Sequence, residues 1–252
     1  MMKFASIGSG SAGNGLVVRN GVSALMIDCG FSTREAEHRL ARVGMTPADL
    51  DAVLVTHEHG DHSGGVSAFA RKHAIPVHTT AGTAKAAKLT KCDLRVLRSE
   101  EPVTIGSFTV MPVTVPHDAR EPCQFVVSVD GRSLGVLTDL GSISNLVRKH
   151  YTKCDALVLE FNHDNDMLQN GPYPYGLKKR IGGPWGHLNN NQAMELLAEV
   201  NLEGVQHLVA AHLSEQNNCP DKVRSLLSEQ VRSANNLVVA DQDTGFDWLE
   251  II

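Results

Sequence analysis

A dense cluster of histidines and acids follows an apolar run early in the chain, and it constrains the fold more than any other feature. The segment VLVTHEHGDHSGG at residues 53–65 contains three histidines and two acids within six residues. Polar side chains at this density are costly to bury unless something binds them. The continuous apolar run before them is typical of a buried strand. The sequence therefore predicts a strand that ends in a metal-binding loop.

The spacing inside the cluster predicts two neighbouring groups of ligands. Side chains two residues apart in an extended segment share a face, so His57 and His59 are expected to point the same way. Gly60 allows the chain to bend, so Asp61 and His62 are expected to point toward a second position nearby. Imidazole suits zinc, iron and related metals, and a carboxylate adds a harder oxygen ligand.

Three polar residues elsewhere in the chain each follow an apolar run and are candidates for the remaining ligands. They are His117 in VTVPHDA, Asp139 in GVLTDLG and His212 in HLVAAHLS. Side chains at strand ends are held by a rigid scaffold, which is where a site is best built. Ordinary capping of a strand end is the alternative interpretation for each of the three residues.

The order of the other elements predicts a mixed α/β (α+β) fold. We expect two mixed sheets flanked by helices, in a single domain over residues 1–252. Asn20-Gly21 and Asp130-Gly131 each separate two apolar runs and predict tight hairpins. Residues 162–187 are rich in Gly, Pro and Asn and are predicted to form a long loop. Helices are expected at 32–44, 64–73, 81–89, 143–150, 190–200 and 220–233. Strands are expected at 3–7, 16–19, 22–28, 51–56, 75–80, 102–105, 107–115, 124–129, 133–139, 155–160, 205–211, 236–240 and 245–251.

Composition narrows the class of protein. The net charge of −5 gives no overall basic field, so a nucleic-acid partner requires a local basic patch. The five widely spaced cysteines form no CxxC pair, which favours reduced thiols. No apolar run approaches the roughly 20 residues of a membrane span, and the N-terminus lacks the apolar core of a signal peptide. We therefore expect a cytoplasmic protein without membrane association.

The motifs, taken in order, resemble those of the metallo-β-lactamase fold superfamily over essentially the whole chain. That family has an αββα sandwich with a two-metal cleft along one edge. The resemblance starts at Asp28 in MIDCG, which it implies to be a residue that orients ligands, with a turn-forming Asp as the alternative. The resemblance implies one divalent cation held by His57, His59 and His117, a second held by Asp61, His62 and His212, and Asp139 as the bridge between them. The cations would be Zn²⁺ or Mn²⁺, and these ligands also accept Fe²⁺.

Finer details resemble the YycJ/WalJ branch of that superfamily, through the strings GSGSAGN, VPHDA, LEFNHD, NGPYPYGLKKRI, GHLNN and HLSEQNN. That branch implies 5′→3′ exonuclease activity on DNA, with a metal-bridging hydroxide as the nucleophile. Glu160 followed by Gly186-His187 also resembles the layout of ribonuclease Z, where a Glu supports a His that protonates the leaving oxygen. Asp61, Glu160 and His187 are thus the candidate catalytic residues. The family pattern has a Ser or Thr nearby where this chain has Leu-Asn-Asn after His187.

A basic and aromatic segment at residues 171–192 is the candidate DNA-binding surface. It contains Lys178, Lys179 and Arg180 without an intervening acid, and three of the chain's five Tyr and Trp residues. Cations suit phosphates, and flat rings suit bases. His163 and Asn189 are further candidate substrate-binding residues. A packed lid is the alternative interpretation of the segment.

We therefore predict a dinuclear metal-dependent phosphodiester hydrolase, most simply a DNA exonuclease, with DNA as its partner and a homodimer as a candidate assembly. One rival is a hydrolase of a small molecule, such as a cyclic phosphodiester or a thioester, and a narrow capped cleft would favour it. A second rival is a non-hydrolytic di-iron protein. Such relatives swap or lose ligands and carry a flavin domain, whereas this chain keeps the hydrolytic set of residues.

Overall fold

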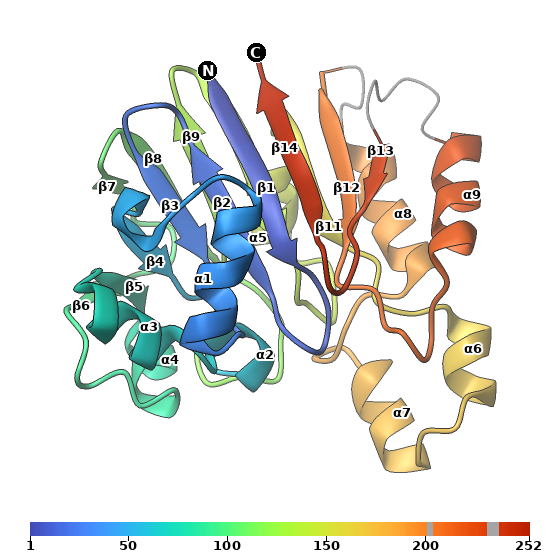
Figure 1. Cartoon of the computed structure of the whole chain (residues 1–252). Coiled ribbons are helices and arrows are strands. Elements are labelled where there is room, and N and C mark those ends of the chain that lie inside the picture. The colour runs from blue at the N-terminus through green and yellow to red at the C-terminus, as the bar shows by residue number, and fades with distance from the viewer. Residues whose placement is uncertain (201–203, 231–236) are drawn as a thin grey trace.

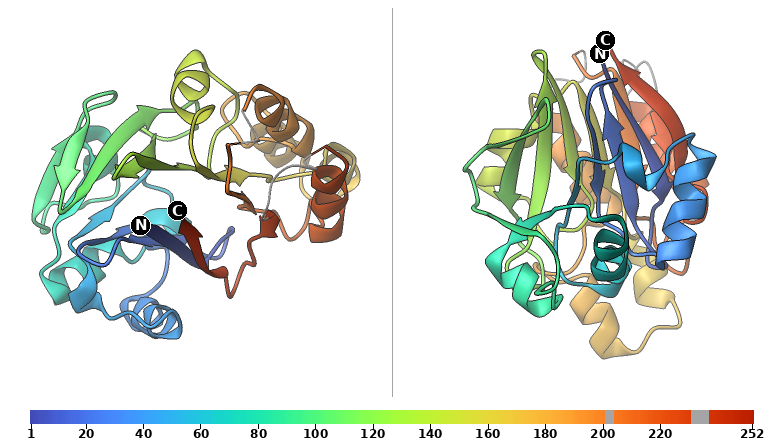
Figure 2. Two further views of the ribbon diagram at one scale, coloured as in Figure 1. Left: turned by 90° about the horizontal axis from the view of Figure 1, so that it is seen from above. Right: turned by 60° about the vertical axis from the view of Figure 1, so that its left-hand side comes forward.

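Two seven-stranded sheets lie face to face, with helices on their outer faces (Figures 1 and 2). The computed structural model describes residues 1–200, 204–230 and 237–252. Both sheets contain parallel and antiparallel neighbours, which confirms the predicted sandwich of two mixed sheets flanked by helices.

The first sheet begins antiparallel and continues parallel. The hairpin predicted at Asn20-Gly21 joins β2 to β3, and the parallel part starts where β3 pairs with β4. An edge strand, β6, was not predicted, because two of its four residues are exposed and its apolar pattern is weak. In spatial order the strands are β14 (Phe246–Ile251), β1 (Met2–Gly8), β2 (Gly15–Arg19), β3 (Ala24–Ile27), β4 (Ala52–Leu54), β5 (Val77–Thr80) and β6 (Leu94–Leu97).

The second sheet has the same division into an antiparallel and a parallel part. Its strands β10, β11 and β12 run parallel, so their carboxyl ends meet at one edge. In open sheets, ligands bind beyond such carboxyl ends. In spatial order the strands are β13 (Leu237–Val239), β12 (His207–Ala211), β11 (Ala156–Glu160), β10 (Arg132–Leu137), β9 (Cys123–Val129), β8 (Phe108–Thr114) and β7 (Val103–Ile105).

Helices cover the outer faces of both sheets. The predicted cap at Ser32 is present, because its side chain accepts a hydrogen bond from the backbone N–H of Glu35. The first sheet carries α1 (Thr33–Arg42), the short 3₁₀ turn η1 (Pro47–Asp49), α2 (Gly60–Ser63), α3 (Val66–His73) and α4 (Ala81–Ala86). The second carries α5 (Asn145–Tyr151), α8 (Asn190–Glu199) and α9 (Pro220–Gln230). Residues 231–233 of the last predicted helix and residue 236 of the following strand lie outside the described residues.

The long loop predicted at 162–187 is wrong, because two short helices lie within it. They are α6 (Asn165–Asn170) and α7 (Tyr175–Ile181), and both lie below the sheets in Figure 1. Asp164 caps α6 by accepting a hydrogen bond from Met167 N. Pro174 precedes the first turn of α7, where its fixed φ is tolerated. Helix-breaking residues mark the ends of these helices, which hid the helices in the sequence pattern.

The largest apolar layer lies between the sheets and includes the fully buried rings of Phe4, Phe108 and Phe125. Two further apolar clusters lie between each sheet and its helices. These three layers fix the strand ends relative to one another. Among the described residues there is no helix with the length and apolar character needed to cross a membrane.

Candidate metal centre

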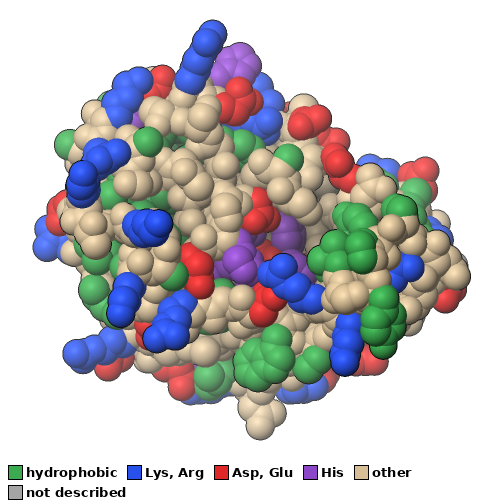
Figure 3. Space-filling model, turned by 90° about the horizontal axis from the view of Figure 1, so that it is seen from below, with side chains coloured by type: hydrophobic (Ala, Val, Ile, Leu, Met, Phe, Trp, Pro, Cys, Tyr) green, Lys and Arg blue, Asp and Glu red, His purple; other side chains and the backbone are tan. Residues whose placement is uncertain are grey.

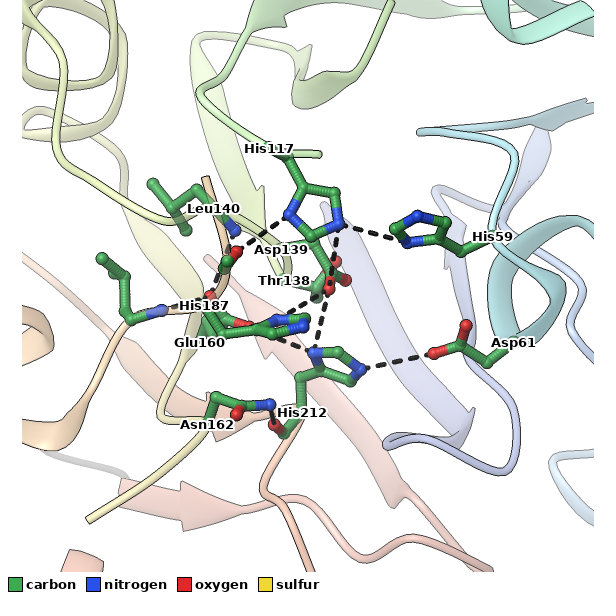
Figure 4. Close-up of polar contacts among 12 residues, drawn as sticks. His59, Asp61, His117, Thr138, Asp139, Leu140, Glu160, Asn162, His187 and His212 are labelled. Carbon is green, nitrogen blue, oxygen red and sulfur yellow. Dashed lines mark hydrogen bonds and ion pairs between the residues drawn. The ribbon is translucent and has the colours of Figure 1, made fainter. Parts of the chain in front are cut away.

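The predicted ligands meet at the edge where the carboxyl ends of strands from both sheets come together. Figure 4 labels His59, Asp61, His117, Asp139 and His212 among them. His57 follows β4 of the first sheet. In the second sheet His117, Asp139 and His212 follow β8, β10 and β12. Both sheets therefore supply candidate ligands to the same cluster. The register of the strands determines which of these side chains lie close to one another.

Three imidazoles form the first group of candidate ligands. His57 Nε2 lies 3.0 Å from His59 Nδ1, and His117 Nε2 lies 3.2 Å from the same atom. The expectation that His57 and His59 share a face agrees with this contact. His57 and His117 are buried, whereas the side chain of His59 is 28% exposed.

A carboxylate and two imidazoles form the second group. Asp61 Oδ2 lies 3.5 Å from His62 Nε2 and 3.5 Å from His212 Nε2. Gly60 starts the one-turn helix α2, and this turn brings Asp61 and His62 to the second position. The bend was predicted at Gly60, but the helical turn was not.

Asp139 lies between the two groups. Its Oδ2 is 2.9 Å from His62 Nε2, and its Oδ1 is 3.9 Å from His117 Nε2. The carboxyl group is 1% exposed and faces histidines of both groups. The bridging role that the family resemblance implies for Asp139 stays a prediction.

Each buried candidate ligand among the histidines has a partner on the ring nitrogen that faces away from the centre. Thr56 Oγ1 donates to Asp28 and lies 2.9 Å from His57 Nδ1, so it accepts the proton of that ring. His62 Nδ1 lies 2.7 Å from Asp28 Oδ2, and the role of Asp28 in orienting a ligand stays a prediction. The carbonyl oxygen of Gly186 lies 2.9 Å from His117 Nδ1. Such partners orient the rings, so that the other nitrogen points toward the centre, where a metal would bind.

Thr56, Asn14 and the Gly186 carbonyl were missed in the sequence. Thr56 had a usable signal, since it is the last polar residue before the histidine block. Asn14 belongs to the GSGSAGN string, and its Nδ2 lies 2.9 Å from His62 Nε2 while its backbone N donates to Asp61 O. A backbone carbonyl leaves no mark in a sequence.

Divalent cations fit this set of donors. At a zinc–nitrogen distance of about 2.0–2.1 Å, tetrahedral ligands lie roughly 3.3 Å apart. The spacings of 3.0 and 3.2 Å in the first group and 3.5 Å in the second bracket that value. Among the described residues, buried His212 Nε2 has the long 3.5 Å ion pair with Asp61 and no hydrogen bond, which is costly unless a ligand binds it.

The two groups differ in electrostatics. Burial, together with His62, holds the pKa of His57 well below its usual value, and burial also lowers the pKa of His117. Burial disfavours the charged ring of His62 too, but Asp139 and Asp28 outweigh it and raise the pKa of His62 to about 10. In the same way Asp139, Asp61 and Glu160 overcome burial and raise the pKa of His212 to about 10.

Glu160 holds His187 at the mouth of the site. Its Oε1 lies 2.7 Å from His187 Nδ1 and 3.1 Å from His212 Nδ1. Its Oε2 accepts backbone hydrogen bonds from Leu140 and Leu188. Both oxygens of the Glu160 carboxylate thus accept hydrogen bonds from the protein. This arrangement suits a residue that orients the His187 and His212 rings. Burial opposes the charge on His187, but Glu160 and Asp139 raise the pKa of His187 to about 10.

The centre opens on the lower face of the molecule. Histidine side chains are visible at the bottom of a hollow in the space-filling view (Figure 3). The side chains of His59, Asp61 and His187 are 28%, 24% and 21% exposed, whereas Asp139 and His62 are buried. A substrate would therefore reach the centre between these three partly exposed residues.

The candidate substrate-binding residues take different positions. Lys178, Lys179 and Arg180 lie on α7, and Arg180 pairs with Asp118 beside His117. His163 is fully buried, and neither ring nitrogen has a hydrogen-bond partner among the described residues. Asn189 caps α8 by accepting a hydrogen bond from Gln192 N. A role of His163 or Asn189 in substrate binding stays a prediction.

Comparison with known proteins places the chain in a family. A family model described as "Beta-lactamase superfamily domain" matches residues 24–213. The chain is similar to the exodeoxyribonuclease YycJ of Bacillus anthracis, with 33% identity over 233 residues that cover 90% of this chain and 88% of that protein. It is similar to the exodeoxyribonuclease WalJ of Streptococcus pneumoniae serotype 2, with 30% identity over 253 residues, 98% of this chain and 92% of that protein. The crystal structure of the metallo-β-lactamase fold protein YhfI from Bacillus subtilis matches with a TM-score of 0.74 at 20% identity, covering 99% of each chain.

Proposed function

The chain is a metal-dependent hydrolase of the metallo-β-lactamase superfamily, and from this premise we propose that it is a DNA exonuclease that degrades DNA from the 5′ end. One observation carries the proposal: two ligand groups joined by Asp139 lie beside His187 in a chain that matches two exodeoxyribonucleases over nearly its full length. The polarity follows the branch of the family that the sequence resembles.

Two divalent cations are the proposed cofactors. His57, His59 and His117 would hold one, Asp61, His62 and His212 the other, and Asp139 would contact both. When bound, such cations lower the pKa of water and stabilise charge on phosphoryl oxygens.

His187 is the proposed proton donor to the leaving oxygen. Glu160 binds Nδ1, so Nε2 is the nitrogen left to face the substrate. The ring is 21% exposed at the mouth of the site, which gives a substrate access to it. Glu160 acts through His187 and His212 and is therefore a positioning residue.

Features at the rim support a nucleic-acid substrate. The α7 helix carries Lys178, Lys179 and Arg180, with Lys179 and Arg180 exposed. Tyr175 is 79% exposed and Trp185 is 61% exposed, which is unusual for such large rings. Exposed rings beside cations are the combination that binds bases and phosphates of a single strand.

The direct test measures DNA turnover after the purified chain has been stripped of metal and reloaded with single divalent cations. We expect ordered loss of nucleotides from a 5′-phosphorylated strand labelled at its 3′ end, with little release from the other end. The Asp61→Ala variant, checked for folding by circular dichroism, serves as the inactive control. Turnover of bis-p-nitrophenyl phosphate without turnover of DNA would instead support a small phosphodiester as substrate.

A further inference from the structure

A second cluster of cations, separate from α7, lies on the first sheet. Residues 62–92 contain five Lys or Arg and no Asp or Glu, in a chain whose net charge is −5. Three of the five, Lys85, Lys88 and Lys91, lie on α4 or just after it, and all three are exposed. None of these three lysines forms an ion pair or a side-chain hydrogen bond with a described residue. We call them the α4 lysines.

The α4 helix is tied to the loop that carries His117. The hydroxyls of Thr80 and Thr83 both donate to the backbone carbonyl of Glu121, at 2.7 and 3.1 Å. Gly82 N donates to the carboxylate of the same glutamate. Glu121 lies four residues after the candidate ligand His117. The α4 lysines are therefore held at a fixed position relative to the metal centre.

The same loop contacts α7 at its other end. Asp118 pairs with Arg180, and its Oδ1 lies 3.6 Å from His117 Nε2. Residues 117–121 thus separate two basic rims, one on α7 and one on α4. In Figure 3, Lys and Arg side chains gather on the side of the hollow where α3 and α4 lie.

The two rims differ in the availability of their cations. On α7, Lys178 donates to the carbonyl of Gln169, and Arg180 is paired with Asp118. Two of its three cations therefore have partners, whereas the α4 lysines are free within the described residues. Unpaired surface cations are the groups that release counterions when they bind phosphates.

We propose that the α4 lysines bind backbone phosphates of a DNA strand whose terminal phosphodiester lies at the metal centre. The inference rests on the proposed exonuclease function and adds the path of the strand. A strand that enters the cleft at its end must leave it over a rim, and the α4 rim offers three free point charges beside the loop of His117. Lysine suits this task, because its ammonium group contacts phosphates without selecting a base.

The test replaces the three lysines together in the full chain, as K85A/K88A/K91A. With a long 5′-phosphorylated single strand, we expect KM to rise roughly 10-fold and the salt dependence of binding to become shallower by about 2, since each phosphate contact on a single strand contributes about 0.7. Turnover of bis-p-nitrophenyl phosphate should not change, because that ester is too short to reach α4. K85R/K88R/K91R should restore binding of the long strand.

A matched control removes the same charge elsewhere. Lys3 is the second residue of β1, and Lys149 and Lys153 lie on and after α5. Lys3 pairs with Glu250 and Lys149 with Glu100, so this control matches the charge removed. K3A/K149A/K153A should leave KM and the salt dependence as in the wild type. An unchanged salt dependence in the α4 variant would overturn the inference, and so would an equal effect in the control or a loss of activity on the small ester. Failure of the wild-type chain to degrade DNA would overturn the proposed function itself.

Discussion

The two halves of the metal centre are built from different chemistry. The half at His57, His59 and His117 has imidazoles only, and the partners of His57 and His117 are a hydroxyl and a backbone carbonyl. The half at Asp61, His62 and His212 contains a carboxylate, and two more carboxylates, Asp28 and Glu160, stand behind its histidines. Neighbouring sites in one cluster can thus be tuned apart by the residues behind the ligands. The first half suits a softer cation, and the second adds hard oxygen donors.

The largest effect on metal content and turnover should come from mutations that remove a ligand from one half or from both. Asp61→Ala removes a ligand from the second half only, so we expect one bound cation per chain in place of two and loss of turnover. Asp139→Ala removes the carboxylate that contacts both halves, so the content of both cations should fall. Elemental analysis of dialysed protein measures the number of cations bound per chain. Two cations and full activity in Asp61→Ala would contradict the division into halves.

Replacement of His187 should lower the rate of turnover without changing the metal content of either half. It is the proposed proton donor and belongs to neither of the two proposed ligand sets, so His187→Ala should keep both cations and lose roughly 10²–10⁴-fold in kcat. Its ring also lies within metal-binding distance of Asp139 and His212, so the metal content has to be measured as well. Parallel measurement of kcat and metal content separates the two roles. A fall in metal content would make His187 a ligand.

Substitution behind the ligands should affect the second half more than the first, because the Asp28 carboxylate reaches His57 only through the Thr56 hydroxyl. Asp28 binds His62 Nδ1 and two donors of Thr56, so Asp28→Asn keeps the shape but removes the charge. Loss of such a partner costs roughly 10–100-fold in metal affinity. Calorimetric titration of the metal-stripped protein should show this loss for one of the two cations and a smaller loss for the other. Equal weakening of both would show that the halves are not independent.

The smallest expected effect is a difference between the two halves in the pH dependence of cation binding. The carboxylates raise the pKa of His62 and of His212 to about 10, so both rings carry an extra proton at neutral pH, and a cation must displace it. The pKa of His57 and of His117 is lowered, so the first half has no such proton to lose. Binding to the second half should therefore tighten as pH rises from neutrality toward 10. Calorimetry in buffers of different ionisation enthalpy counts the protons, and equal release from both halves would contradict the difference.

Much of this centre could be predicted from the sequence, because the features that place it are local. The histidine block and the polar residues that close the apolar runs at His117, Asp139 and His212 are visible in one dimension. Parallel strands then bring their carboxyl ends to one edge. The structure brings the predicted ligands together, and their occupation by cations stays a prediction.

Other parts could not be predicted, for reasons that are also physical. The Gly186 carbonyl is a backbone group and has no side chain to identify it. The α7 helix was taken for loop, because Gly and Pro at its ends dominated the pattern. The absence of acids from 62–92 is visible in the sequence, but only the contacts of Glu121 with Thr80 and Thr83 place α4 beside the metal centre.

The origin of the ligands in both sheets has a consequence for the stability of the fold. Residues 57–62 follow a strand of one sheet, whereas His117, Asp139 and His212 follow strands of the other. A cation shared between them joins the sheets as a cross-link would, and a ligand that binds only the folded chain raises the free energy of unfolding. Chelation should then separate the sandwich first along this edge, where backbone amides would exchange with solvent soonest. The supply of metal would govern how long the folded chain survives as well as how fast it works.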